Sequence, residues 1–124
     1  MTDRVFIIAE AGVNHNGSLD AALNMIDAAA EAGADAVKFQ SFKAESLVTA
    51  RAEKAAYQAA NTGQGGDQLA MLKALELSTE DHAALAERCR ANGVRFMSTA
   101  FDMDSLRMLA GFDMPAIKIP SGDL

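Results

Sequence analysis

The 124-residue sequence has one cysteine, few basic residues and no long hydrophobic run, and each shortage excludes a class of protein. A single cysteine, Cys89, cannot form a disulfide within the chain, so nothing argues against a reducing, cytoplasmic setting. The apolar run from Val5 to Ala9 is too short for a membrane span or a signal peptide. With 11 basic and 17 acidic residues, the net charge is −6. We therefore expect neither a nucleic-acid nor a membrane partner.

What is present is a folded, globular composition, with 50% hydrophobic and 23% charged residues. Short segments rich in Val, Ile and Phe predict four strands, over residues 5–9, 35–41, 94–98 and 116–119. Helical periodicity fills the intervals, over residues 18–32, from Ser78 to the glycine at 93, and from about Asp102 to the glycine at 111. A glycine after each helix and before each strand completes a βαβαβαβ pattern, which predicts a parallel sheet.

Two architectures fit that pattern, a doubly wound open sheet and a (β/α)₈ barrel. Polar residues end every predicted strand, and Lys38 and Gln40 share one face of the second strand because they lie two positions apart. A charged side chain facing the inside of a sheet is costly unless a site uses it. In barrels, chemistry gathers at the C-terminal ends of the strands. The sequence therefore favours the barrel.

The segment 43–67 interrupts the alternation. Its first part is rich in alanine and charge and predicts a surface helix, whereas the glycine-rich stretch 61–67 predicts a loop. Placed after the second strand, this insertion would hang over the C-terminal face as a lid or form a plain surface excursion.

Several local patterns have a structural explanation. The stretch from Gly12 to Gly17 has the glycine spacing of a phosphate loop but lacks its lysine, so it predicts a tight turn that leads into a helix. His82 lies among acidic residues and is expected at the surface. His15, above the first strand, could touch a substrate or help to hold a metal, but no second ligand with a recognisable spacing accompanies it. Asp102 and Asp104 are expected to be helix-start carboxylates.

The remaining polar residues cluster at the predicted strand ends. Two lysines and two hydroxyls can surround a phosphate or a carboxylate, and a carboxylate beside them can act as a base or orient a hydroxyl. This set predicts an enzyme that acts on a phosphorylated or carboxylated small molecule, without defining the reaction. Its members are Glu10, Lys38, Gln40, Thr99, Lys118 and Ser121.

Five ordered strings carry a resemblance to a known family. They are IIAEAGVNHNG (7–17), AGADAVKFQSF (32–42), LELSTEDH (75–82), FMSTAFD (96–102) and PAIKIPSGDL (115–124). In order and spacing they resemble the N-acetylneuraminate (sialic acid) synthase family, which includes the legionaminate and pseudaminate synthases.

The resemblance implies a (β/α)₈ barrel that condenses phosphoenolpyruvate with an open-chain N-acetylated sugar aldehyde, giving a nonulosonic acid and phosphate. It also implies a divalent metal, Mn²⁺ or Mg²⁺, and a C-terminal antifreeze-like domain supplied by a dimer partner. By motif, phosphoenolpyruvate would be bound by Lys38, Thr99, Lys118 and Ser121. Glu10 and Gln40 would contact the sugar, with Glu10, Lys38 and Lys118 as the catalytic group.

Three positions depart from the family pattern. Asp123 stands at a substrate-binding position where the family has glutamate. The aspartate keeps the negative charge, but its side chain is shorter. Ala100 replaces a proline, and Asn61 matches a family asparagine only loosely. The family's metal-binding histidines belong to strands beyond Leu124, and such a barrel needs about 250 residues. We therefore expect these 124 residues to be the N-terminal half of the barrel, inactive alone.

Two alternatives stay open. Lys38 or Lys118 could act as the nucleophile of a Schiff-base aldolase. The chain could instead be a non-catalytic half-barrel that serves in binding or assembly, and its unpaired sheet edges predict self-association.

Overall fold

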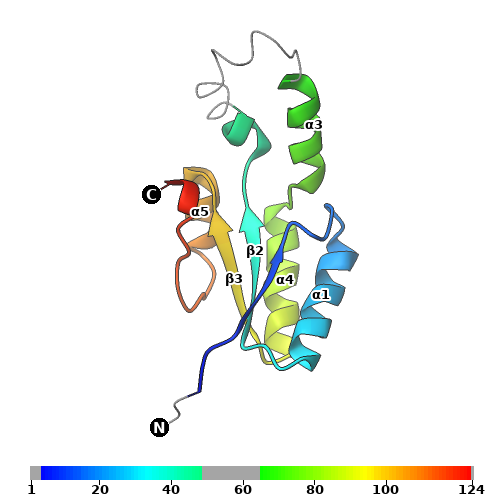
Figure 1. Cartoon of the computed structure of the whole chain (residues 1–124), viewed down its shortest axis with the longest axis vertical. Coiled ribbons are helices and arrows are strands. Elements are labelled where there is room, and N and C mark those ends of the chain that lie inside the picture. The colour runs from blue at the N-terminus through cyan, green and yellow to red at the C-terminus, as the bar shows by residue number, and fades with distance from the viewer. Residues whose placement is uncertain (1–3, 49–64, 124) are drawn as a thin grey trace.

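A computed structural model of the chain describes residues 4–48 and 65–123. Strands alternate with helices in the described part, and a turn of 3₁₀ helix, η2, comes last (Figure 1). The elements, in chain order, are β1 (Ile8–Gly12), α1 (Leu19–Glu31), β2 (Ala36–Ser41), α3 (Gly65–Leu75), α4 (Thr79–Ala91), β3 (Arg95–Ala100), α5 (Met103–Leu109) and η2 (Ser121–Asp123). Residues 44–48 are also helical.

The three strands form one parallel sheet in the order β1-β2-β3 (Figure 1). Their C-terminal ends therefore reach the same edge of the sheet, as the alternating pattern predicted. The fourth strand, predicted over residues 116–119, is wrong in extent, because the structure has only one bridge there, between Thr99 and Lys118. Within the described ranges, β3 is the one strand to which this segment is bridged.

The first strand begins three residues later than predicted. The sequence pattern places it over residues 5–9, whereas β1 covers Ile8–Gly12. Pairing explains the shift, since Ile8 is matched with Ala36, the first residue of β2, and earlier residues have no strand partner on that side. Val5 and the two residues after it remain exposed.

Side-chain caps mark the start of two helices. The Ser18 hydroxyl accepts from the backbone N–H of Ala21 at the start of α1. At the start of α4, Ser78 and Asp81 form a reciprocal capping box. Each such cap stabilises a helix by about 1 kcal/mol. Beyond the ends of α1 and α4, Gly33 and a second glycine at 93 adopt positive φ angles of 91° and 72°, which terminate the two helices.

The hydrophobic core lies between the sheet and the helices. Helices α1 and α4 pack side by side against the sheet (Figure 1). Ile26 of α1 and Leu85 of α4 are fully buried against Phe39 and Phe96 of the strands. Burial of each of these side chains contributes about 1.5–3 kcal/mol. This layer fixes the strands, so the residues on their opposite face are held on a rigid sheet.

The insertion differs in part from its predicted structure. Of the segment 43–67, residues 49–64 lie outside the described residues. The loop predicted over 61–67 is wrong at its end, because Gly65, Gly66 and Asp67 form the first turn of α3. The backbone hydrogen bonds of a helix outweigh the weak helix propensity of two glycines here. Helix α3 stands beyond the C-terminal edge of the sheet (Figure 1), which is where a lid was expected.

Candidate functional site

Glu10 and Lys38 form an ion pair at the centre of the candidate site. They are register partners on β1 and β2, and Lys38 Nζ lies 2.6 Å from Glu10 Oε2. The Lys38 side chain is 17% exposed and that of Glu10 is 49% exposed. A mostly buried ammonium requires a nearby anion. An anionic ligand that enters the site would therefore compete with Glu10 for Lys38.

Gln40 and Thr99 continue the site toward the ends of the strands. They are register partners on β2 and β3, two positions beyond the register pair of Lys38 and Met97. Thr99 is buried, so its hydroxyl is presented within the sheet edge rather than free in solvent. Gln40 also lines a cavity of about 130 Å³, whose other walls include Leu72 and Leu75 of α3. Helix α3 therefore covers this part of the strand edge with apolar side chains.

The absence of a side chain at Gly12 leaves room for two of these polar groups. A Cβ at this position would stand 3.1 Å from Glu10 Oε1 and 3.6 Å from Gln40 Nε2. Gly12 also has a φ of 56°, and the pairing of β1 shifts between Glu10 and Gly12. The glycine lets the chain turn here while Glu10 and Gln40 approach from neighbouring strands.

The last three predicted residues lie on the C-terminal segment. Lys118 joins the sheet through its bridge to Thr99, and its side chain is exposed. Ser121 and Asp123 are exposed on η2, whose turn is closed by a bond from the Asp123 N–H to the Pro120 carbonyl. The structure therefore brings Glu10, Lys38, Gln40 and Thr99 onto adjacent strands. Lys118 is joined to Thr99 by the single bridge, and Ser121 and Asp123 follow it in the chain. A cavity of about 200 Å³ is lined by both Lys118 and Asp123.

His82 is not at the surface, and that prediction is wrong. The ring is 1% exposed, with Nε2 lying 2.6 Å from Ser41 Oγ and Nδ1 lying 2.7 Å from the Ser78 carbonyl. Ser41 Oγ is also 2.6 Å from Ser98 Oγ. The position of His82 in the first turn of α4 suggested exposure, but this face of the helix packs on the sheet. The serines at the ends of the second and third predicted strands, Ser41 and Ser98, were the only sign in the sequence of a buried polar partner for His82.

His15 is buried behind the first strand, with its ring 6.3 Å from that of Phe39. Its Nδ1 accepts from the Gly17 N–H at 2.9 Å, so in the neutral ring the proton is on Nε2. That Nε2 has no hydrogen-bond partner among the described residues. Burial, followed by the neighbouring His82, lowers the pKa of His15. The site described above lies on the other face of the sheet, which does not support a role for His15 in contacting substrate.

Two other residues have structural roles. The Asp102 carboxylate accepts from the backbone N–H groups of Ser105 and Lys43, each at 2.7 Å, so it caps α5 and holds the segment after β2, as a helix-start carboxylate should. Burial raises the pKa of the Cys89 thiol to about 12, so this cysteine is not a nucleophile near neutral pH.

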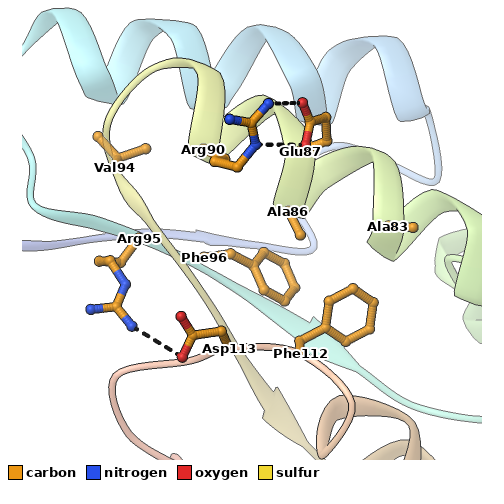
Figure 2. Close-up of a pocket in the computed structure, with 9 residues that line it drawn as sticks. All are labelled: Ala83, Ala86, Glu87, Arg90, Val94, Arg95, Phe96, Phe112 and Asp113. Atoms are coloured by element: carbon orange, nitrogen blue, oxygen red, sulfur yellow. Dashed lines mark hydrogen bonds and ion pairs between the residues drawn. The ribbon is translucent and has the colours of Figure 1, made fainter.

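A larger cavity than those two lies elsewhere. It has a volume of about 460 Å³ and opens beside the N-terminal end of β3 (Figure 2). Phe96 and Phe112 form its apolar wall, and Arg95 pairs with Asp113 at its edge. None of the predicted site residues lines it, so its size does not make it the functional site.

No group of three or more His, Cys, Asp and Glu side chains within 4–48 and 65–123 could hold a metal ion. No helix in the same ranges is long and apolar enough to cross a membrane.

The fold and the site together define an α/β protein with two lysines at the carboxyl edge of parallel strands, one of them paired with a carboxylate. Comparison with known proteins agrees. The chain belongs to the NeuB family, whose profile matches residues 25–124. The resemblance drawn from the five sequence strings is thereby confirmed.

Individual relatives show how much of a protein the chain represents. It is 54% identical over 119 residues to the N,N'-diacetyllegionaminic acid synthase of Legionella pneumophila, covering 96% of this chain and 33% of that one. It is 44% identical over 121 residues to the enzyme of the same name from Campylobacter jejuni, covering 98% of this chain and 36% of the relative. The chain therefore spans about a third of the length of these relatives.

A solved structure gives the architecture. A sialic acid synthetase from Leptospira borgpetersenii, crystallised in complex with citrate, superposes with a TM-score of 0.79 at 36% identity. The match covers 98% of this chain and 38% of that one. The structural neighbours of the present chain are TIM-barrel proteins, so the preference for a barrel over a doubly wound sheet is confirmed.

Proposed function

We propose that this chain carries the phosphoenolpyruvate side of a nonulosonate synthase site. The reaction joins phosphoenolpyruvate to an N-acetylated sugar aldehyde of the N-acetylmannosamine type and releases phosphate. The names of the relatives support this proposal, since they are synthases of legionaminic and sialic acids. Because the chain covers only about a third of them, we expect no turnover from these 124 residues alone. We place the reaction in the cytoplasm, consistent with the single buried cysteine.

One observation carries the proposal, namely the Lys38–Glu10 pair set beside Thr99 at the strand ends. Phosphoenolpyruvate carries a phosphate and a carboxylate, and both need cations in a site that excludes bulk water. In the proposal Lys38 and Lys118 supply the cations, while Thr99 and Ser121 donate hydroxyl hydrogen bonds.

The ion pair also suggests how the two substrates are coordinated. An arriving phosphoenolpyruvate would draw the Lys38 ammonium away from Glu10. The Glu10 carboxylate would then be free to accept hydrogen bonds from sugar hydroxyls, with Gln40 beside it. Asp123, at the exposed end of the C-terminal segment, would contribute to substrate binding with a shorter reach than the glutamate usual in the family.

We further propose that the complete protein uses Mn²⁺ or Mg²⁺. The described residues do not fit a complete metal site, since they contain no cluster of three ligating side chains. Ligands from outside the described residues are therefore required, and the roles assigned above to Lys38, Glu10 and Thr99 do not depend on the metal.

The proposal is tested by measuring phosphoenolpyruvate binding to the chain by titration calorimetry. Loss of one charge-assisted contact costs about 1.5–3 kcal/mol, so Lys38→Ala and Lys118→Ala should each weaken binding by roughly 10-fold to 100-fold. Arg90→Ala is the matched control, because Arg90 also pairs with a glutamate but stands near the opposite end of the sheet (Figure 2). Equal affinities in the wild type and both lysine variants would refute the assignment.

The Schiff-base alternative is less compatible with the geometry. A Schiff-base lysine attacks through its lone pair, which an ammonium engaged in an ion pair does not offer. Lys38 is in such a pair, and Lys118 is exposed rather than desolvated. Neither lysine has the surroundings that activate an amine nucleophile.

Exposed apolar surface favours a second role, in assembly. Val5, Phe6, Ile7 and Ile8 are 42–71% exposed at one edge of the described sheet, and Ile117 and Ile119 are exposed beyond the other. Unpaired strand edges with apolar side chains favour association. We propose that the isolated chain self-associates through these edges, whether or not it contributes to a catalytic site.

A further inference from the structure

A chain of hydrogen bonds lies behind the candidate site, on the helix-facing side of the sheet. Ser98 of β3, Ser41 of β2 and His82 of α4 are linked at 2.6 Å each, and His82 is linked at 2.7 Å to the Ser78 carbonyl. All three side chains are 1–2% exposed. These hydrogen bonds therefore tie two neighbouring strands to the first turn of a helix inside a mainly apolar layer.

The direction of each bond follows from which atoms can donate. The Ser78 carbonyl only accepts, so His82 Nδ1 carries the proton and Nε2 accepts from the Ser41 hydroxyl. The Ser41 oxygen is then left to accept from the Ser98 hydroxyl. Burial lowers the pKa of His82, which keeps the ring in the neutral form that this arrangement requires. Every member thus has a defined partner, and a fully satisfied buried network selects one geometry.

The two serines of the network are sequence neighbours of two candidate site residues. Ser41 directly follows Gln40 in β2, and Ser98 directly precedes Thr99 in β3. Gln40 and Thr99 are register partners, and their side chains point to the face opposite the serines because strand side chains alternate. A displacement of either serine therefore moves a predicted substrate contact on the other face.

We propose that His82 is a positioning residue, which acts through Ser41 and Ser98 to set the separation and orientation of Gln40 and Thr99. The inference rests on the proposed function, because those two residues are assigned there to substrate contacts. A hydrophobic residue would fill the space beside Phe96, against whose ring His82 packs edge-on at 6.4 Å, but it would not fix the two strand ends. Binding sites lose performance when their groups move by about 0.5–1 Å.

Two substitutions at His82 separate its two bonds. An asparagine is long enough to replace Nδ1 toward the Ser78 carbonyl but does not reach Ser41, whereas a glutamine amide can take the place of Nε2. His82→Asn should therefore lose the hydrogen bond to Ser41 that holds the strands, and His82→Gln should keep it. Ser98→Ala removes only the last member and serves as a milder variant if His82→Asn fails to fold. Cys89→Ala, a buried change on the same helix outside the network, is the control for lost stability.

The experiment records the backbone amide NMR signals of Gln40 and Thr99 in the free chain, together with the affinity for phosphoenolpyruvate. We expect His82→Asn and Ser98→Ala to shift both signals and to weaken binding by about 10-fold, a fraction of the loss produced by a 1 Å misplacement. His82→Gln and Cys89→Ala should stay close to the wild type in both measurements.

The outcomes are distinguishable. Unchanged amide signals in His82→Asn and Ser98→Ala, or shifted signals with wild-type affinity, would overturn the positioning role. Equal weakening by Cys89→Ala would show that lost stability alone explains the effect, which also overturns it. If the wild-type chain does not bind phosphoenolpyruvate, the proposed function fails for this chain, and the link between His82 and the strand ends is judged from the amide signals alone.

Discussion

Gly17 is a position at which a single added methyl group should strongly disturb the described structure. A Cβ placed on this residue would lie 1.9 Å from the carbonyl oxygen of Ala74, near the end of α3. That atom is backbone, so it cannot rotate away as the tip of a long side chain could. Gly17 also has a φ of 83°, in the left-handed region that other residues rarely adopt. Gly17→Ala therefore adds a clash to a conformational penalty.

The two penalties can be estimated separately. The left-handed conformation costs a non-glycine residue about 1–2 kcal/mol. Overpacking a tight contact costs about 1–3 kcal/mol more. Together they predict a loss of about 2–5 kcal/mol, a large part of the roughly 5–15 kcal/mol that stabilises a typical domain. If α3 moves instead, the cavity beside Gln40 opens and part of the loss is avoided.

Urea unfolding followed by circular dichroism measures the total loss, and hydrogen exchange of the α3 amides reports a local displacement. Gly33→Ala and Gly93→Ala are matched controls, since both positions have a positive φ but nothing within 4 Å of the added Cβ. They should lose only about 1–2 kcal/mol. A Gly17→Ala variant no less stable than these controls, with unchanged exchange in α3, would refute the contact between α3 and the turn after β1.

Two further predictions concern pH and association. Burial is the main cause that lowers the pKa of both His15 and His82. It outweighs the hydrogen bond to the Ser78 backbone, which raises the pKa of His82, and the charge of Asp81, which raises both values. The contribution of the two histidines to stability is therefore complete above the unfolded value of 6.5 and falls with pH below it, until the folded pKa values are passed. The free energy of unfolding measured with urea should fall between pH 7.5 and 5.5, by up to about 1.4 kcal/mol per pH unit for each histidine, and His82→Gln should reduce the slope; a flat profile would contradict this. Light scattering should show oligomers, and Ile7→Lys in the exposed edge should shift them toward monomer, whereas a monodisperse wild-type monomer would argue against self-association.

The candidate site was largely predictable because its polar residues lie at the ends of predicted strands, where their spacing shows which face they share. The i, i+2 spacing of Lys38 and Gln40 placed them on one face, and the structure adds the direct partner, Glu10, at 2.6 Å. The buried histidines were not predictable in the same way. His82 looks solvated among its acidic neighbours, and only the packing of α4 on the sheet turns its ring toward Ser41.

The sequence by itself determined the alternation of strands and helices and the helix caps, because hydrophobic period and capping chemistry are local properties. It also determined which residue types end each strand. The tertiary structure decided where β1 begins, since that depends on the first residue of its partner, and it reduced the fourth strand to a single bridge. It also brought α3 against the turn at Gly17 and assembled the Ser98–Ser41–His82 chain. These features join segments far apart in sequence, and such pairings depend on three-dimensional packing that no local pattern records.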